Sequence, residues 1–178
     1  MNALTKLAAA LPEAAKDLRL NLSAVLQSAV LTPAQAWGVA AAVALATRHS
    51  ELRDAVLADA EAAVGAAVID DAVAAASLMA MNNIYYRFRH LVGRPEYEQR
   101  APRLRMQRLQ KPATNAADFE LMALAVSAIH GCAMCVAAHE RVVIQAGLTE
   151  DQVHDAIRIA AVIHGFAVAL PIPRSAVA

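Results

Sequence analysis

Residues 120–139 read ELMALAVSAIHGCAMCVAAH, and both cysteines of the chain lie in this stretch, at Cys132 and Cys135. A histidine, His139, follows the second cysteine by four residues. The flanking sequence is mostly alanine, leucine and valine at the spacing of buried or amphipathic helices, which carry little chemistry of their own. We therefore expect the functional groups of the chain to lie in residues 120–139.

Gly131 in the middle of this stretch predicts a turn, with one helix ending before it and another beginning at about Cys132. In one continuous helix Glu120 and His139 would lie ~28 Å apart, at ~1.5 Å per residue. If the chain reverses at Gly131, Glu120 lies ~16 Å before the turn and His139 ~12 Å after it. Antiparallel packing of the two helices would then bring the carboxylate and the imidazole within reach of each other.

Four residues of this hairpin form the candidate catalytic set, namely Cys132, Cys135, His139 and Glu120. A helix N-terminus stabilises a thiolate, and the pKa of a CxxC thiol is often lowered. His139 lies one helical turn after Cys135, on the same face, where a base can serve a nucleophilic thiol. Glu120 could orient that base and stabilise its charge. His130 is an auxiliary candidate because of its place beside Cys132.

A disulfide between Cys132 and Cys135 is expected to distort the first turn of the second helix. Helical Cβ atoms three residues apart lie ~5–6 Å from each other, whereas a disulfide needs ~3.5–4.5 Å.

Three other interpretations of the stretch stay open at this point. Two cysteines on an apolar helix can be buried small hydrophobic residues, and Glu120 can be a solvated acid near a helix N-terminus. The two cysteines and His139 could also be zinc ligands, with Glu120, His130 or another histidine as the fourth. No second ligand pair lies at the spacing that structural zinc sites commonly have. His164, in an apolar run, is expected to be a buried core histidine.

Composition limits the class of protein. The chain has 178 residues, of which 58% are hydrophobic and 18% charged, and its formal net charge is zero. Few charges on so small a body predict a homo-oligomer, and the absence of a basic face argues against a nucleic-acid partner. No apolar run is long enough for a membrane span, and the N-terminal run is too short for a signal peptide. We therefore expect a cytoplasmic protein, in which a CxxC pair is more typical of redox or metal chemistry than of a structural disulfide.

Helical periodicity and capping signals cover the rest of the chain, and no segment alternates as a strand does. The sequence predicts a single all-α domain over residues 1–178, with these helices: 2–11, 13–28, 33–47, 50–63, 69–89, 119–130, 132–146 and 150–170. Thr32 and Thr149 each begin a capping box, closed by Gln35 and Gln152. Residues 90–113, rich in proline and arginine, predict a solvated connector with one helical turn near 103–109.

An internal repeat is a further hypothesis. At an offset of 84 residues Trp37 aligns with Leu121, and the positions of the two cysteines are taken by Arg48 and Glu51. The domain would then consist of halves 30–90 and 114–172, of which only the second carries the redox pair.

Taken together, these residues resemble the alkyl hydroperoxidase D family of the carboxymuconolactone decarboxylase-like superfamily. The family pattern is Glu, eleven residues, CxxC, three residues, His, and it is met by Glu120, Cys132, Cys135 and His139. The segments 79–87 (MAMNNIYYR) and 35–38 (QAWG) also resemble family segments. Met134 departs from the pattern, because well-known members have a histidine there, which puts in doubt the proton-relay role assigned to that position. Met134 and His130 are therefore kept as auxiliary candidates.

The resemblance implies an all-helical homotrimer that acts as a thiol peroxidase. It implies that Cys135 attacks the peroxide and that Cys132 completes a disulfide, with no bound cofactor. It implies re-reduction by dihydrolipoyl groups of an acyltransferase and lipoamide dehydrogenase, or electron transfer to a peroxiredoxin (AhpC-like) partner. Alternatives are a redox sensor or disulfide adaptor with little turnover and a lactone decarboxylase, which the CxxC pair argues against.

Overall fold

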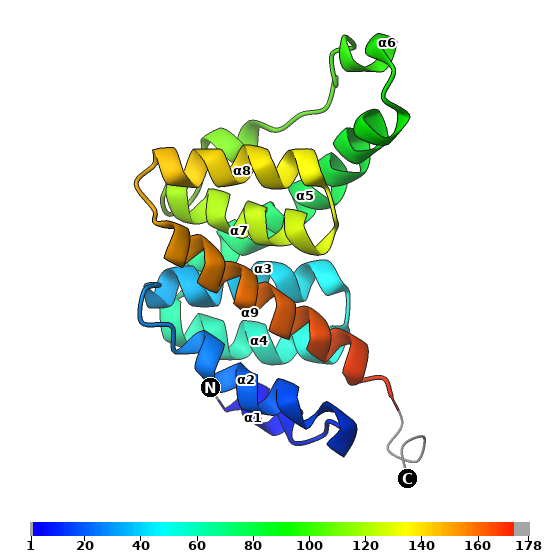
Figure 1. Cartoon of the computed structure of the whole chain (residues 1–178). Coiled ribbons are helices and arrows are strands. Elements are labelled where there is room, and N and C mark those ends of the chain that lie inside the picture. Colours follow the sequence, from blue (N-terminus) through cyan, green and yellow to red (C-terminus); the bar gives the residue numbers. More distant parts are fainter. Residues whose placement is uncertain (1, 173–178) are drawn as a thin grey trace.

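The computed structural model describes residues 2–172, and these residues form helices with no strand among them, as predicted (Figure 1). The elements are α1 (Ala3–Ala8), η1 (Glu13–Ala15), α2 (Lys16–Leu26), α3 (Pro33–Thr47), α4 (Ser50–Val64), α5 (Ala66–Val92), α6 (Pro95–Glu98), η2 (Gln107–Gln110), α7 (Ala116–Ile129), α8 (Ala133–Gln145) and α9 (Glu150–Ala169).

The capping signals of the sequence fix the helix starts. The side chain of Thr32 accepts a hydrogen bond from the backbone of Gln35, whose side chain accepts one from Thr32 in return. Thr149 and Gln152 form the same capping box at the start of α9. Both predictions are confirmed. Helix α7 begins three residues earlier than predicted, because Asn115 itself caps it through the backbone of Asp118.

Helices α3 and α7 form the centre of the molecule. Val39 and the alanines and valine that follow it in α3 are fully buried, as are most residues of α7 from Phe119 to Ser127. A helix that is apolar on all sides is stable only when other elements surround it. Helices α8, α7, α3 and α4 follow one another in a stack, and α9 crosses its front (Figure 1).

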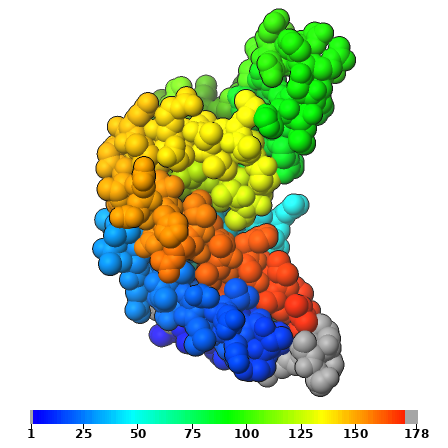
Figure 2. Space-filling model, viewed as in Figure 1, coloured from blue at the N-terminus to red at the C-terminus, as the bar shows by residue number. Residues whose placement is uncertain are grey.

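The second half of α5 and the short α6 project from this stack (Figure 2). Along this projection Ile84, Phe88 and Leu91 are 61%, 47% and 75% exposed. The connector that follows contains α6 and η2, so the predicted helical turn near 103–109 is found at Gln107–Gln110. No helix among residues 2–172 combines the length and the apolar character that crossing a membrane requires.

The helix order of the first half returns in the second at the predicted offset. Helices α3, α4 and α5 start at residues 33, 50 and 66, and α7, α8 and α9 start at residues 116, 133 and 150. Each pair of starts is 83 or 84 residues apart. The division into two halves stays a prediction.

The connector is held to α5 by one buried carboxylate. The Asp71 side chain is fully buried and accepts hydrogen bonds from Arg108, from the backbone of Ala113 and from both the backbone and hydroxyl of Thr114, at 2.6–2.9 Å. Arg108 also donates to Asp70, which is 65% exposed. These contacts hold the chain that leads into α7.

We predict that Asp71→Ala lowers the free energy of unfolding by about 3 kcal/mol, because it leaves the donors of Ala113 and Thr114 without a partner and removes the buried carboxylate from Arg108, which keeps only the exposed Asp70. Asp70→Ala is the matched control, since the same arginine loses an exposed partner, and the expected cost is below about 1 kcal/mol. Urea denaturation of both variants measures the difference. Equal effects of the two substitutions would contradict the anchoring role of Asp71.

Candidate active site

The chain reverses between α7 and α8 through a Schellman motif. Gly131, with a φ of +66°, donates its N–H to the carbonyl of Ala128, and Cys132 donates its N–H to the carbonyl of Ser127. This pair of bonds closes the last turn of α7, and the left-handed conformation at its centre favours glycine. The predicted bend at Gly131 is confirmed. The two backbone hydrogen bonds of the motif fix the position of Cys132 relative to the last turn of α7.

Cys132 is the N-cap residue of α8 and forms a disulfide with Cys135. Its backbone is extended (φ −93°, ψ 90°), and its carbonyl accepts the hydrogen bond from Val136 that opens the helix. Cys132 lies before the first helical turn rather than in it, so the helical Cβ spacing from which a distortion was expected does not apply to this pair. The Cα atoms of the pair are 5.3 Å apart, within the usual range for a disulfide.

Both cysteines of the disulfide are buried. Cys132 is 0% and Cys135 6% exposed, whereas Met134 between them is 45% exposed. The residue that replaces the expected histidine therefore lies at the surface beside the disulfide.

Glu120 and His139 meet across the hairpin, as the reversal at Gly131 predicts. The imidazole Nδ1 lies 2.6 Å from Glu120 Oε2, and the two side chains are only 14% and 18% exposed. A short, shielded contact between a carboxylate and an imidazole fixes the ring and favours a proton on Nδ1. Two residues that are 19 positions apart in sequence thus act as one pair.

The other ring nitrogen of His139 faces Met79 of α5 rather than a cysteine. Its Nε2 lies 3.2 Å from the Met79 sulfur, and Met79 is fully buried. Within residues 2–172 neither nitrogen of His139 hydrogen-bonds to a cysteine sulfur. The sequence placed His139 on the face of Cys135, but Met79 was not predicted, since a methionine on a long helix reads as a core residue.

His130 is held by a second group of polar residues that the sequence did not reveal. Its Nδ1 lies 3.0 Å from the amide nitrogen of Asn83, whose oxygen accepts a hydrogen bond from Ser127. Arg87 donates to the backbone carbonyl of His130. Asn83 and Ser127 are buried, and the sequence signals for this cluster are the paired asparagines inside a long apolar helix and the resemblance of residues 79–87 to a family segment. Because these contacts hold the residue two places before Cys132, they also position the turn.

The electrostatic surroundings of His130 disfavour its charged form. Partial burial lowers the pKa of this imidazole below its ordinary value, and the positive charges of Arg87 and Arg48 lower it further. A backbone hydrogen bond with Met79 acts in the opposite direction, and His164 adds a smaller lowering. His164 itself is exposed, so the expectation of a buried core histidine is wrong: it lies on the solvent side of α9, near enough to His130 to affect it.

We predict that the NMR titration of His130 has its midpoint below the ordinary histidine value of ~6.5. Since the unfolded chain takes up this proton at higher pH than the folded chain, folding is favoured above ~6.5, and this contribution is lost as the pH falls through the lowered pKa. The free energy of unfolding should therefore decrease over that window, and less so in His130→Asn. A midpoint at or above ~6.5 would contradict the described environment.

The described part of the chain has no arrangement of side chains that supports the zinc interpretation. No group of three or more histidine, cysteine, aspartate or glutamate side chains there is arranged to hold a metal ion. Cys132 and Cys135 are joined to each other, and His139 faces Glu120 and Met79.

Fold and site together define the class: all-helical proteins with a CxxC disulfide at the start of a helix, next to a glutamate–histidine pair. Residues 95–171 match the model of the carboxymuconolactone decarboxylase family. The chain is 60% identical, over its full length and 96% of the relative, to alkyl hydroperoxide reductase AhpD of Anaeromyxobacter dehalogenans (strain 2CP-C). It is 47% identical to the AhpD of Solibacter usitatus, over 98% of this chain and 99% of the relative, and 46% identical to that of Brucella canis, over 90% and 91%. The chain belongs to the alkyl hydroperoxide reductase AhpD family.

Proposed function

We propose that this chain is a thiol peroxidase that reduces organic hydroperoxides through a dithiol–disulfide cycle of Cys132 and Cys135. The observation that carries the proposal is the 2.6 Å contact between Glu120 of α7 and His139 of α8, the helix that begins at the CxxC pair. The names of the relatives support the substrate class, because they are called alkyl hydroperoxide reductases.

In the first step the thiolate of Cys135 attacks the terminal oxygen of the hydroperoxide. The O–O bond breaks, Cys135 becomes a sulfenic acid, and the alkoxide leaves with the electron pair of that bond. Cys132 gives its proton to the alkoxide, which departs as the alcohol. The Cys132 thiolate then attacks the Cys135 sulfur, the S–O bond breaks, and hydroxide leaves as water after taking a proton.

Glu120 and His139 prepare Cys135 for this attack. The carboxylate orients the imidazole, which can take the proton of the Cys135 thiol and so leave a reactive thiolate. In the disulfide state Nε2 of His139 lies against Met79, and a thioether can only accept a hydrogen bond. We propose that this nitrogen turns to Cys135, directly or through a water molecule, once the disulfide is reduced. His130 precedes the turn at Gly131 and Met134 follows it in α8, and neither has a required proton-transfer role in this scheme.

The cycle closes when an external dithiol transfers two electrons and two protons to the disulfide. We propose that this dithiol is a dihydrolipoyl group on an acyltransferase, itself kept reduced by lipoamide dehydrogenase. The reduced CxxC pair can in turn pass its electrons to a peroxiredoxin partner of the AhpC type. The two cysteine sulfurs carry both electrons, so the scheme requires no bound cofactor. We propose a homotrimer, in line with the exposed Phe88 and Leu91 near the end of α5, and a location in the cytoplasm.

The test is the consumption of an organic hydroperoxide with dihydrolipoamide as reductant. We predict steady turnover by the wild type and a loss of about a thousandfold or more in Cys135→Ser, because the nucleophile is gone. Full turnover by Cys135→Ser would overturn the assignment. If the protein cycles once with peroxide but does not turn over, the redox-sensor alternative is correct.

We predict that Glu120→Gln lowers kcat/KM about 100-fold, since it keeps the shape of the side chain but removes its charge from the histidine. Glu140→Gln is the matched control, because Glu140 is the exposed glutamate directly after His139, and its activity should equal that of the wild type. Equal rates for both variants would refute the role of the Glu120–His139 pair and leave the peroxidase assignment standing.

A further inference from the structure

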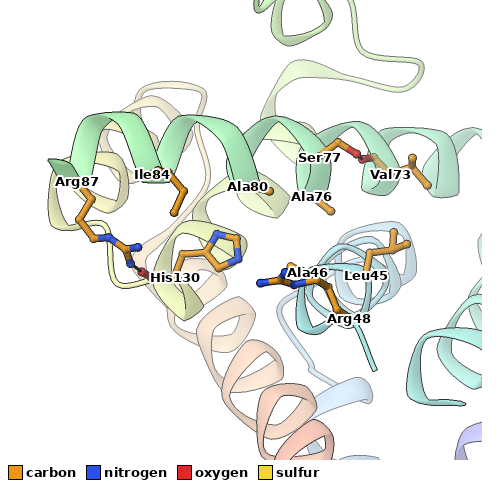
Figure 3. A pocket seen from close by; sticks show the side chains of 10 residues that line it. All are labelled: Leu45, Ala46, Arg48, Val73, Ala76, Ser77, Ala80, Ile84, Arg87 and His130. Carbon is orange, nitrogen blue, oxygen red and sulfur yellow. Dashed lines mark hydrogen bonds between the residues drawn. The ribbon is translucent and has the colours of Figure 1, made fainter. Parts of the chain in front are cut away.

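A pocket of about 540 Å³ lies between the end of α3, the middle of α5 and the end of α7 (Figure 3). This volume falls in the range of sites for small organic ligands. None of the catalytic candidates Cys132, Cys135, Glu120 and His139 lines it. His130 does, and it lies two residues before Cys132, so an occupant of the pocket would lie beside the turn that carries the disulfide.

The pocket has an apolar wall and a positively charged side. Leu45 and Val73 lie at one end, and Ile84 adds a further apolar surface along α5. Arg48 and Arg87 lie on either side of His130, which projects into the pocket from the end of α7 (Figure 3). A ligand that fits this lining has a hydrocarbon body and an anionic head.

The positive charge in the pocket has no acidic partner in the described part of the chain. Neither Arg48 nor Arg87 forms an ion pair there, whereas Arg19, Arg53, Arg108 and Arg158 each pair with a carboxylate. Arg87 uses one nitrogen on the carbonyl of His130, and a guanidinium has further N–H donors available. Arginine without a carboxylate partner at the wall of a pocket is the arrangement that binds carboxylate or phosphate heads.

The backbone at Arg48 adds an independent observation. This residue ends α3 in the left-handed conformation, with a φ of +60°. Glycine or asparagine is favoured at such a position, and an arginine there carries a conformational cost. Residues in costly conformations tend to lie at functional sites, where the side chain is needed. Here the residue with the costly backbone conformation is Arg48, and its guanidinium points towards His130 (Figure 3).

We propose that this pocket binds an anionic amphiphile, with a carboxylate or phosphate head held by Arg48 and Arg87 and a hydrocarbon body against Leu45, Val73 and Ile84. The site is separate from the cysteine chemistry and does not depend on the proposed peroxidase function. The anionic head of the ligand lies next to His130. Because His130 directly precedes the turn at Gly131, binding in the pocket can affect the turn that holds Cys132.

Isothermal titration calorimetry of the full-length protein with decanoate tests the proposal, with decyl phosphate and uncharged decanol as the other two probes. We expect saturable binding of one or both anions and at least tenfold weaker binding of decanol, since a charge-assisted hydrogen bond contributes about a factor of ten or more. Stronger binding of decanoate or of decyl phosphate identifies the head group. Equal binding of decanol and the anions would overturn the proposal, as would no binding of any probe.

Variants locate the site. Arg48→Gln should weaken binding of the anion about tenfold or more, and Arg48→Lys should restore part of it. Arg53→Gln is the matched control, because Arg53 pairs with Asp54 on the surface of α4 and lies outside the pocket. Saturating decanoate should also shift the NMR titration of His130 upward in the wild type. Unchanged affinity in a folded Arg48→Gln protein, or an unchanged His130 titration, would contradict the assignment.

Discussion

The site depends on the reversal of the chain at Gly131. One residue, Cys132, completes the hydrogen bonding of the last turn of α7 and also caps the first turn of α8. The helix that carries His139 is thereby folded back along the helix that carries Glu120, and the 2.6 Å contact between them follows from this pairing. The same turn places Cys132 just before the regular helix, where the disulfide joins it to Cys135 in the first turn of α8.

Helix α5 joins the two histidines of the site from the opposite side. The sulfur of Met79 lies against Nε2 of His139, and the backbone of the same residue forms a hydrogen bond with His130. One turn further along α5, Asn83 contacts Nδ1 of His130 and connects it to Ser127 of α7. The first half of the chain has no cysteines, but through α5 it fixes the orientation of both imidazoles. Through Arg48 at the end of α3 it also provides the charge of the neighbouring pocket.

The hairpin and its contents could be predicted because they depend on local signals. The glycine at the turn and the spacing between Glu120, the cysteines and His139 all lie within 20 residues of sequence, and helix geometry converts this spacing into a contact. The partners from α5 could not be predicted, because Met79 and Asn83 reach the site only through helix packing across about 50 to 60 positions of sequence. Periodicity shows which residues share a helix face, but it does not show which residues of two distant helices contact each other. The burial of His164 was misjudged for a related reason: an apolar run indicates a helix in the core but does not show which of its faces is turned to solvent.

The central claim is that Glu120, acting through His139, raises the reactivity of Cys135. The most direct measurement is the rate of alkylation of Cys135 by iodoacetamide across pH in the Cys132→Ser protein, where Cys135 is the only thiol. The account predicts that half-maximal alkylation occurs below ~8.5, the ordinary value for a free thiol, and that adding Glu120→Gln moves this midpoint to higher pH. An identical pH dependence with and without the Glu120 carboxylate would contradict it.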